Sequence, residues 1–106
     1  PVVIAERAER DMASQYGWYL ENADSVVAER YLHAIDQSIQ QLAVDPALGV
    51  RRHFQADELR GIRSLQAPRP FDKHLIFYRY DARLSIERVM HGTRDLPIRL
   101  IEVPEN

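Results

Sequence analysis

The sequence predicts an α+β fold with elements in the order β-α-α-β-β-β, formed by a single domain over residues 1–106. Three patterns lead to this prediction: a short β-branched run at the start, two stretches with helical spacing of apolar residues, and three later runs typical of strands. With 106 residues, 45% of them hydrophobic and 28% charged, the chain can bury one modest core. We therefore expect a folded globular protein.

The first half predicts one strand and two helices. Residues 2–4 are β-branched and favour a strand. Over residues 6–22 apolar side chains recur every three or four positions, which predicts an amphipathic helix. Asp24 or Ser25 can cap a second helix that ends before Pro46, and the short link requires an antiparallel helix pair. The apolar stripes are Ala8, Met12, Tyr16, Tyr19 and Leu20 in the first helix, and Val27, Tyr31, Ile35, Ile39 and Leu42 in the second.

A turn, an irregular stretch and three strands are predicted for the rest of the chain. Pro46 cannot continue a helix and Gly49 permits a positive φ, so this segment predicts a stop and a turn. Residues 50–60 are polar and predict irregular backbone. Strands are expected over residues 62–67, 74–80 and 84–90, and the link between the last two is short enough for a hairpin.

The alternation of apolar residues describes the sheet further. Residues 74–80 are apolar on both faces, which indicates a central strand. Its aromatic residues could stack nucleic-acid bases, but packing within the sheet is the simpler interpretation. Val89 and Met90 are adjacent apolar residues, which predicts a bulge or a strand covered on both faces. Residues 98–103 are interpreted as a final short strand or a mobile tail.

Several classes of protein are excluded by composition. The sequence has no cysteine, which excludes disulfides, thiolate metal sites and a cysteine nucleophile. It has neither an apolar run of about 18 residues nor a secretory signal, so we expect a cytoplasmic protein. His33, His53, His74 and His91 fall on four different predicted elements, so we expect no metal site and no cofactor.

Charge is divided unevenly along the chain. Residues 1–50 carry three arginines and eight acidic residues, net −5, whereas residues 51–106 carry eleven basic and eight acidic residues, net +3. Thirteen of the fourteen basic residues are arginine, whose planar guanidinium suits carboxylate or phosphate partners. The second half therefore presents either a solvated basic face or a docking surface for an anionic partner.

The segment RVMHGTRDL, Arg88 to Leu96, gathers a histidine, two arginines and an aspartate near the end of the last predicted strand. A metal-free ribonuclease would need a base, an acid and cations near the phosphorane. No paired carboxylate and histidine is evident from the spacing. His91 is therefore more simply a strand-end residue that bonds the following turn, although parts of a nuclease site could come from His91, Arg63, Arg79, Arg88 and Arg94.

Five segments in order resemble the ParE toxins of the RelE/ParE superfamily: AERDM, AERYLHAIDQSIQQLAVDPALG, LRGIRSL, HLIFYRYD and IERVMHGTRDLP. The resemblance covers roughly residues 2–97 and implies a βααβββ domain with a helix hairpin on a mostly antiparallel sheet. The chain departs from the usual pattern at Ala5-Glu6, where Ser/Thr-Pro is common, and at Gln15, where a bulky aliphatic residue is common.

The resemblance implies a function as the toxin of a type II toxin–antitoxin pair. Its partner would be a ParD-like ribbon-helix-helix antitoxin, through which alone it would meet operator DNA. Its target would be DNA gyrase, whose inhibition stops replication. RelE-like relatives instead cut mRNA in the ribosomal A site. The chain looks like the first group, because it lacks a lysine-rich second strand and its sole lysine, Lys73, precedes a strand. An adaptor without toxicity is a third alternative.

Site residues follow from the same resemblance. No catalytic residue is expected, and target binding and toxicity are expected at His91, Arg94, Asp95 and the tail that follows. We expect the antitoxin to contact aromatic residues of the first helix and arginines of the second half, namely Tyr16, Trp18, Tyr19, Arg52, Arg63, Arg79 and Arg83. Residues 51–99 carry eleven basic and six acidic residues, net +5, which suits an acidic amphipathic segment that folds on binding.

Overall fold

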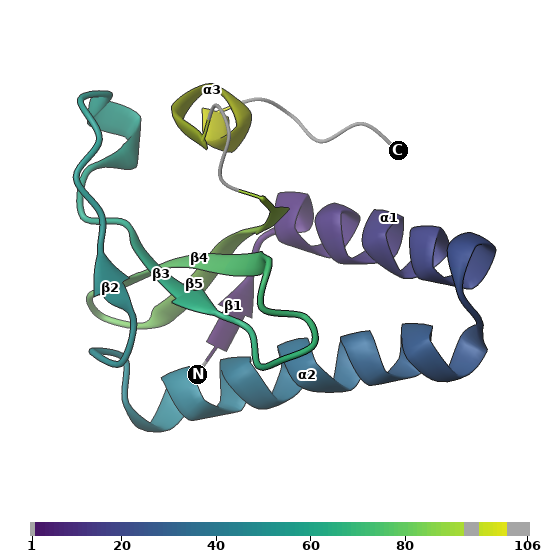
Figure 1. Ribbon diagram of the computed structural model, residues 1–106. Helices are drawn as coiled ribbons and strands as arrows, with labels where there is room; N and C mark the ends of the chain where they lie inside the picture. Colours follow the sequence, from purple (N-terminus) through teal and green to yellow (C-terminus); the bar gives the residue numbers. More distant parts are fainter. Residues whose placement is uncertain (1, 93–95, 102–106) are drawn as a thin grey trace.

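The computed structural model describes residues 2–92 and 96–101 (Figure 1). It contains a five-stranded sheet in the order β1-β5-β4-β3-β2, in which β1 is parallel to β5 and the other pairs are antiparallel. The predicted α+β class and element order are confirmed. The elements are β1 (Val2–Ile4), α1 (Glu6–Asn22), α2 (Ser25–Val44), β2 (Val50–Arg51), the 3-10 helix η1 (Asp57–Leu59), β3 (Arg63–Gln66), β4 (His74–Tyr80), β5 (Leu84–His91) and α3 (Leu96–Ile101).

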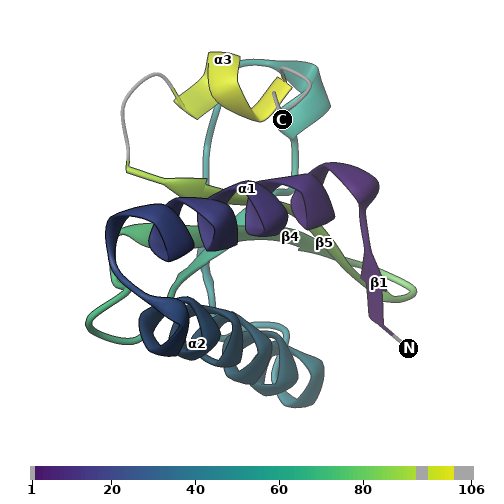
Figure 2. The same ribbon diagram turned by 90° about the vertical axis from the view of Figure 1, so that its right-hand side faces the viewer.

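Both faces of the sheet are covered. The antiparallel pair α1 and α2 packs on one face, and α3 with η1 lies on the other (Figures 1 and 2). The larger core joins the helix pair to Ile76, Tyr78 and Ile86, and the smaller one joins Phe77 and Met90 to the α3–η1 layer. The strands β4 and β5 are therefore buried on both sides, as expected for strands without a polar face.

The first helix differs from its prediction in two positions. Leu20 belongs to the predicted stripe but is 43% exposed, whereas Asp11 is 7% exposed and was not expected in the core. Because α1 lies beside β5 and α2 at once, its buried face starts at Ala8 and Asp11 and reaches only partly to its C-terminal turn. The second helix agrees with its prediction, since Asp24 accepts a hydrogen bond from the N–H of Val27 (2.9 Å) and the stripe lies inward.

A bulge interrupts the pairing of β4 and β5. Phe77 pairs with Arg88 and Tyr78 with Ile86, so Glu87 is an extra residue in β5. The bulge and the burial on both faces, which were predicted as alternatives for this strand, are therefore both present. The bulge lies before Val89 and Met90 and not at them. One extra residue moves all later side chains of a strand to the other face.

Two segments were assigned wrongly. Residues 50–60 are not wholly irregular, because they contain β2 and η1. The C-terminal segment is a helix, α3, where a strand around residues 98–103 or a tail was predicted. A strand there would meet an edge of β5 that is already taken, because β1 pairs with residues 84–86 and the side chains of Asp11 and Gln15 bond the N–H and the carbonyl of Val89. Leu100 instead covers the smaller core. Residues 102–106 lie outside the described residues.

Gly49 is needed because of a close approach and not because of its φ. An added Cβ would collide with the hydroxyl of Tyr78. That hydroxyl accepts a hydrogen bond from the N–H of Gly49 (2.9 Å) and donates one to the carbonyl of Pro46 (2.6 Å), which ties the turn after α2 to the middle of the sheet. The glycines with positive φ are Gly61 (80°) and Gly92 (81°), so the predicted use of Gly49 is wrong.

Candidate partner-binding site

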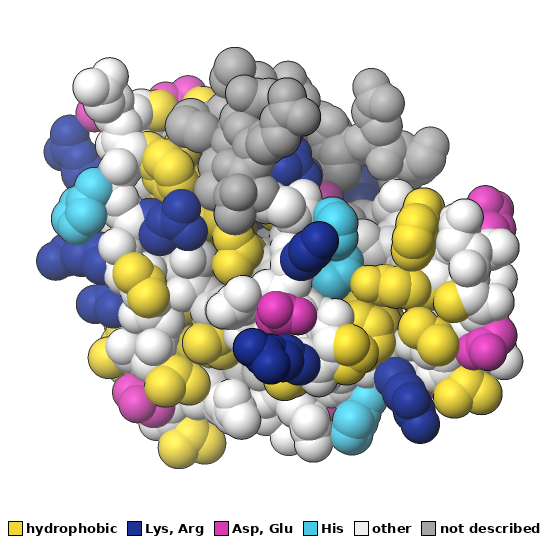
Figure 3. Space-filling view, in the orientation of Figure 1, with side chains coloured by type: hydrophobic (Ala, Val, Ile, Leu, Met, Phe, Trp, Pro, Cys, Tyr) yellow, Lys and Arg dark blue, Asp and Glu magenta, His cyan; other side chains and the backbone are white. Residues whose placement is uncertain are grey.

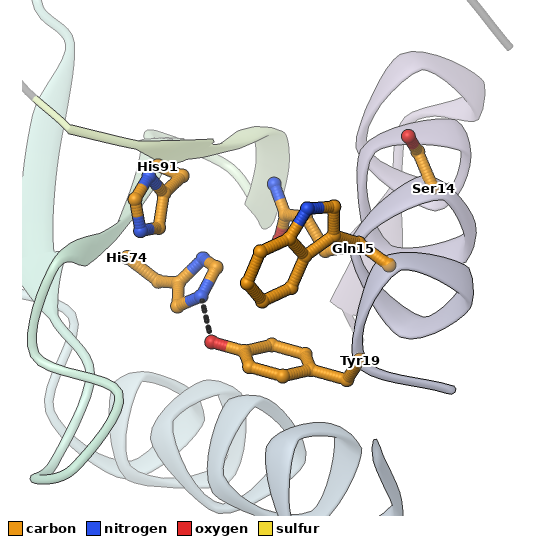
Figure 4. Close-up of a pocket in the computed structure, with 6 residues that line it drawn as sticks. Ser14, Gln15, Tyr19, His74 and His91 are labelled. Atoms are coloured by element: carbon orange, nitrogen blue, oxygen red, sulfur yellow. Dashed lines mark hydrogen bonds between the residues drawn. The ribbon is translucent and has the colours of Figure 1, made fainter. Parts of the chain in front are cut away.

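A pocket of about 330 Å³ lies where α1 meets the start of β4 and the end of β5 (Figure 4). Side chains from these three elements line it, and they are predominantly aromatic or imidazole rings. Trp18 is 59% exposed at this site, so a large apolar surface faces solvent. The lining residues are Ser14, Gln15, Trp18, Tyr19, His74 and His91.

The bulge in β5 brings the two histidines together. His74 and His91 are direct cross-strand partners, and their ring centroids lie 4.8 Å apart in an edge-to-face arrangement. If β5 had no bulge and Glu87 were paired with Phe77, Met90 would stand opposite His74, and His91 would point to the other face. The bulge therefore creates the histidine pair on the helix side of the sheet.

His74 is held in its neutral form. It is 2% exposed, and its Nε2 shares a hydrogen bond of 2.9 Å with the hydroxyl of Tyr19 (Figure 4). Burial and, to a smaller extent, the nearby His91 together lower the pKa of His74 to about 4. Its Nδ1 is buried without a hydrogen-bond partner in the described part of the chain, on the side of the ring turned away from Tyr19.

Gln15 connects the floor of the pocket to the core. Its Nε2 donates to the carbonyl of Val89 (2.8 Å), and its Oε1 accepts from the hydroxyl of Tyr31. Burial raises the pKa values of Tyr31 and Tyr19, so both phenols stay protonated at neutral pH. The Gln15 amide is thus a hydrogen-bonded structural link between α1, α2 and β5.

A buried ion pair joins the first half of α1 to β5. The guanidinium of Arg88 bonds the carboxylate of Asp11 through Nε (2.7 Å) and Nη2 (2.9 Å), and the same carboxylate accepts from the N–H of Val89 (3.0 Å). Arg88 also donates to the carbonyl oxygen of Arg99 in α3 (2.7 Å). The two partners are 5% and 7% exposed, so the pair is shielded from solvent.

The structure brings three of the predicted site residues together and separates the others. Trp18 and Tyr19, expected to contact the antitoxin, share the pocket with His91, which was expected to contact the target. Tyr16 also lies on α1 but does not line the pocket, and desolvation, followed by the nearby Glu29, raises its pKa. Arg94 and Asp95 lie outside the described residues.

The four predicted arginines lie at separate positions, and Arg52, Arg63 and Arg79 make internal contacts. Arg52 donates to Ser64 Oγ (3.1 Å) and covers the rings of Phe54 and Phe77 on the α3 side of the sheet. Arg63 donates to the carbonyl of Gly49 (3.2 Å) on the helix side. In the remaining two cases, Arg79 pairs with Glu87 (2.9 Å) and Arg83 is exposed in the β4–β5 turn.

Basic side chains gather at one end of this view of the molecule, and an apolar patch lies at the other. Figure 3 shows basic side chains at the left, over β2 and η1, and hydrophobic ones at the right, over α1 and α2 near the histidines. Arg51 and Arg60 are exposed at the basic end. Leu20 (43%) and Val26 (58%) are exposed at the apolar end.

His74, Ser14 and Gln15 were not predicted as site residues. Pairing strands outward from the turn at residues 81–83 would have placed His74 within one residue of His91, which was an available signal. The signal for Asp11 was its position three residues after Ala8, on the inward face of α1. Among the described residues, no three metal-ligating side chains are grouped, and no helix is long and apolar enough to cross a membrane.

A family model described as the ParE toxin of the type II toxin–antitoxin system parDE matches residues 2–96. The chain belongs to this family. Among solved structures, a chain from the chromosomal ParDE TA system from P. aeruginosa is 17% identical with a TM-score of 0.71, and the match covers 87% of this chain and 95% of that chain. At this identity the likeness shows the fold. No curated protein matches the sequence. The predicted ParE resemblance is confirmed.

We expect the pocket to make stability depend on pH through His74. Its folded-state pKa of about 4 lies below the ordinary value of 6.5, so the unfolded chain binds the proton first. The stability due to the neutral ring is present above pH 6.5 and is lost as the pH falls toward 4. Between pH 7 and 4.5, His74→Phe should lose roughly 2 kcal/mol less stability than the wild type, allowing for solvent screening.

Urea unfolding at the two pH values measures this difference. The matched control is His33→Phe, because His33 is exposed on α2 and should leave the wild-type pH dependence unchanged. Equal pH dependence in the wild type and His74→Phe would contradict the shifted titration of His74.

Proposed function

We propose that this ParE-family toxin acts by binding a protein target, DNA gyrase, and that a ParD-like ribbon-helix-helix antitoxin neutralises it. The target is suggested by the family, and both partners would be met in the cytoplasm. The observation that supports docking over catalysis is that, in the described part of the chain, the arginines considered for RNA cleavage lie away from His91 or are paired elsewhere. Operator DNA would be contacted through the antitoxin.

RNA cleavage would require a base, an acid and a cation at one phosphate. Near His91 the second histidine is buried and has a pKa of about 4, so at neutral pH its ring is uncharged and cannot serve as the general acid. Arg88 and Arg79 project to the face opposite His91, where they pair with Asp11 and Glu87. Arg63 stands opposite Tyr78. Tyr78 lies four residues along β4 from His74, a distance of about 13 Å along the strand.

The apolar end of the molecule supports an antitoxin site. Trp18, which lines the pocket, and Leu20 and Val26, near the end of α1 and the start of α2, expose large apolar surfaces, and grouped exposed apolar residues often mark a protein interface. Aromatic side chains are enriched among the residues that contribute most to binding energy. The net charge of +5 over residues 51–99 suits an acidic partner that extends beyond this pocket.

Expression without antitoxin tests the target. We expect DNA synthesis to stop before protein synthesis in pulse-labelled cells, and the purified toxin to inhibit gyrase supercoiling with accumulation of cleaved DNA. The double variant Arg94→Ala/Asp95→Ala should reduce this inhibition at least tenfold, on the order of one buried charged contact, while antitoxin affinity stays unchanged. Arg83→Ala, in the exposed β4–β5 turn, is the control for target binding.

Three outcomes would contradict the proposal. Immediate arrest of translation with codon-phased mRNA cuts would favour the RelE-like ribonuclease, particularly if His91→Ala alone abolished toxicity with the fold and antitoxin binding intact. Normal growth on antitoxin-free expression would favour a non-toxic adaptor. Failure to bind any ribbon-helix-helix antitoxin from an adjacent gene would remove the proposed partner.

A further inference from the structure

The described residues that line the pocket carry no fixed charge. None of the six is aspartate, glutamate, lysine or arginine. His74 is buried, and its pKa of about 4 keeps its ring neutral at pH 7. A charged group that entered would lose hydration without gaining a counter-charge from this lining, which is costly. The pocket therefore favours an uncharged occupant.

Aromatic and imidazole rings form the walls of the pocket. The rings of Trp18 and Tyr19 meet edge to face with their centroids 5.3 Å apart, and the centroids of Tyr19 and His74 are 5.9 Å apart. Figure 4 shows the rings of His91, His74 and Tyr19 following one another along the pocket. Aromatic rings attract one another at centroid separations of about 4.5–7 Å, beyond the effect of the area that they bury. These walls therefore favour a further ring over an aliphatic chain.

Contacts with the core hold part of the wall in place. The ring of Tyr19 packs against Tyr31 and Phe71 with centroid separations of 5.3 and 5.5 Å, and its hydroxyl is hydrogen-bonded to His74. The volume of about 330 Å³ lies at the lower end of the range of about 300–1,000 Å³ that is typical of ligand pockets. The pocket is therefore formed before binding, and it has room for one large side chain rather than for a helix.

Nδ1 of His74 gives an occupant a polar partner. This nitrogen is buried without a hydrogen-bond partner in the described part of the chain, whereas buried polar atoms are usually paired. In a neutral imidazole one nitrogen donates and the other accepts, so the bond between Nε2 and Tyr19 leaves Nδ1 as acceptor or donor according to the tautomer. A hydroxyl group can both donate and accept, and it therefore suits either tautomer.

We propose that this pocket receives one tyrosine side chain of the antitoxin, with its ring against Trp18 and Tyr19 and its hydroxyl bonded to Nδ1 of His74. The ring of His91 is exposed beside His74 and turns aside to admit the hydroxyl, because surface side chains change rotamer readily. This inference rests on the proposed function, which supplies the antitoxin as the partner. Tyrosine is also enriched among the residues that contribute most to binding at protein interfaces.

Single amino-acid amides test the pocket without the antitoxin. Trp18 is the only tryptophan in the chain, so its emission, excited where tyrosine does not absorb, reports occupancy of the pocket. We expect N-acetyl-tyrosinamide to bind with a Kd on the order of 1 mM, as suits a ligand of this size. N-acetyl-phenylalaninamide should bind about fivefold more weakly, because it lacks one hydrogen bond. N-acetyl-leucinamide should bind more weakly still, and the amide of N-acetyl-glutamate should not bind.

The variant His74→Phe tests the assigned hydrogen bond. It keeps a ring in the wall and removes Nδ1, so the preference for tyrosinamide over phenylalaninamide should fall from about fivefold to none. His33→Phe is the matched control, because His33 is exposed on α2 and lies outside the pocket lining, and it should keep the preference. The comparison of the two probes in the wild type gives a result even if His74→Phe does not fold.

The antitoxin from the adjacent gene tests the occupant. Its binding should exclude N-acetyl-tyrosinamide from the pocket, because both use the same site. Changing one of its tyrosines to phenylalanine should weaken the complex with the wild-type toxin about fivefold, and should leave the complex with His74→Phe unchanged.

Equal or tighter binding of phenylalaninamide by the wild type would overturn the inference, as would a preference for tyrosinamide that survives in His74→Phe. An antitoxin complex that still binds the probe, or an antitoxin in which no tyrosine substitution has the expected effect, would overturn it and leave the proposed function intact. If the probes bind with the expected preference but no ribbon-helix-helix antitoxin binds the chain, the specificity of the pocket for a tyrosine side chain is supported and the proposed partner alone is wrong.

Discussion

Replacing Asp11 with alanine is expected to lower the free energy of unfolding by about 3–5 kcal/mol, because it leaves the buried guanidinium of Arg88 without its carboxylate. Arg88 is 5% exposed, and its guanidinium donates a hydrogen bond to each carboxylate oxygen of Asp11, at 2.7 and 2.9 Å. The N–H of Val89 would lose its acceptor in the same substitution. Domains of this size are usually stable by about 5–15 kcal/mol, so much of the margin would disappear.

Urea unfolding of Asp11→Ala at pH 7 measures this loss. Glu6→Ala is the matched control on the same helix, since the Glu6–Arg10 pair has side chains that are 76% and 39% exposed. Exposed ion pairs contribute little, so its cost should be under about 1 kcal/mol. If both substitutions lowered the free energy of unfolding by a similar amount, burial of the Asp11–Arg88 pair would not determine its contribution to stability.

The strands and the second helix could be predicted from the sequence because their local patterns agree with their environment. The predicted bounds of residues 74–80 are those of β4, and the stripe from Val27 to Leu42 is the inward face of α2. In both cases apolar periodicity matches burial against a neighbouring layer. Where the local pattern of apolar residues agrees with the tertiary packing, the sequence alone is sufficient to predict the element and its buried face.

Asp11 shows why part of the first helix could not be predicted. A carboxylate between two apolar residues of an amphipathic pattern is normally assigned to solvent, because an unpaired buried charge is costly. Its partner Arg88 lies 77 residues later, so the pair is invisible in any local window. The helix α3 was missed for a related reason, since its carbonyls depend on Arg7 and Arg88 from distant elements.

The candidate site was only partly predictable. Aromatic residues of the first helix and His91 were named, but for two different partners, and their meeting in one pocket depends on the bulge at Glu87. An apolar pair such as Val89 and Met90 indicates an irregularity without locating it to one residue. Because a single residue decides which face His91 occupies, the pocket could not be derived from strand alternation.

Gly49→Ala should be one of the most damaging small substitutions in the chain, with a loss of about 4 kcal/mol. An ideal Cβ at this position would collide with the Tyr78 hydroxyl and lie 2.7 Å from the carbonyl oxygen of Ser64. Tyr78 is fully buried at 0% exposure, so its ring has little space in which to move. Any shift of the ring or of the turn also weakens the two hydrogen bonds of the hydroxyl, to Gly49 and Pro46.

Thermal unfolding of Gly49→Ala beside Gly17→Ala separates this collision from the general effect of adding a methyl group. Gly17 lies inside α1 with no atom within 4 Å of an added Cβ, so alanine there should raise stability by about 0.5–1 kcal/mol through its better helix propensity. The same change should therefore have opposite signs at the two sites. If Gly49→Ala melted within a few degrees of the wild type, Tyr78 would have room to move, and the tie between the turn after α2 and the sheet would not be tight.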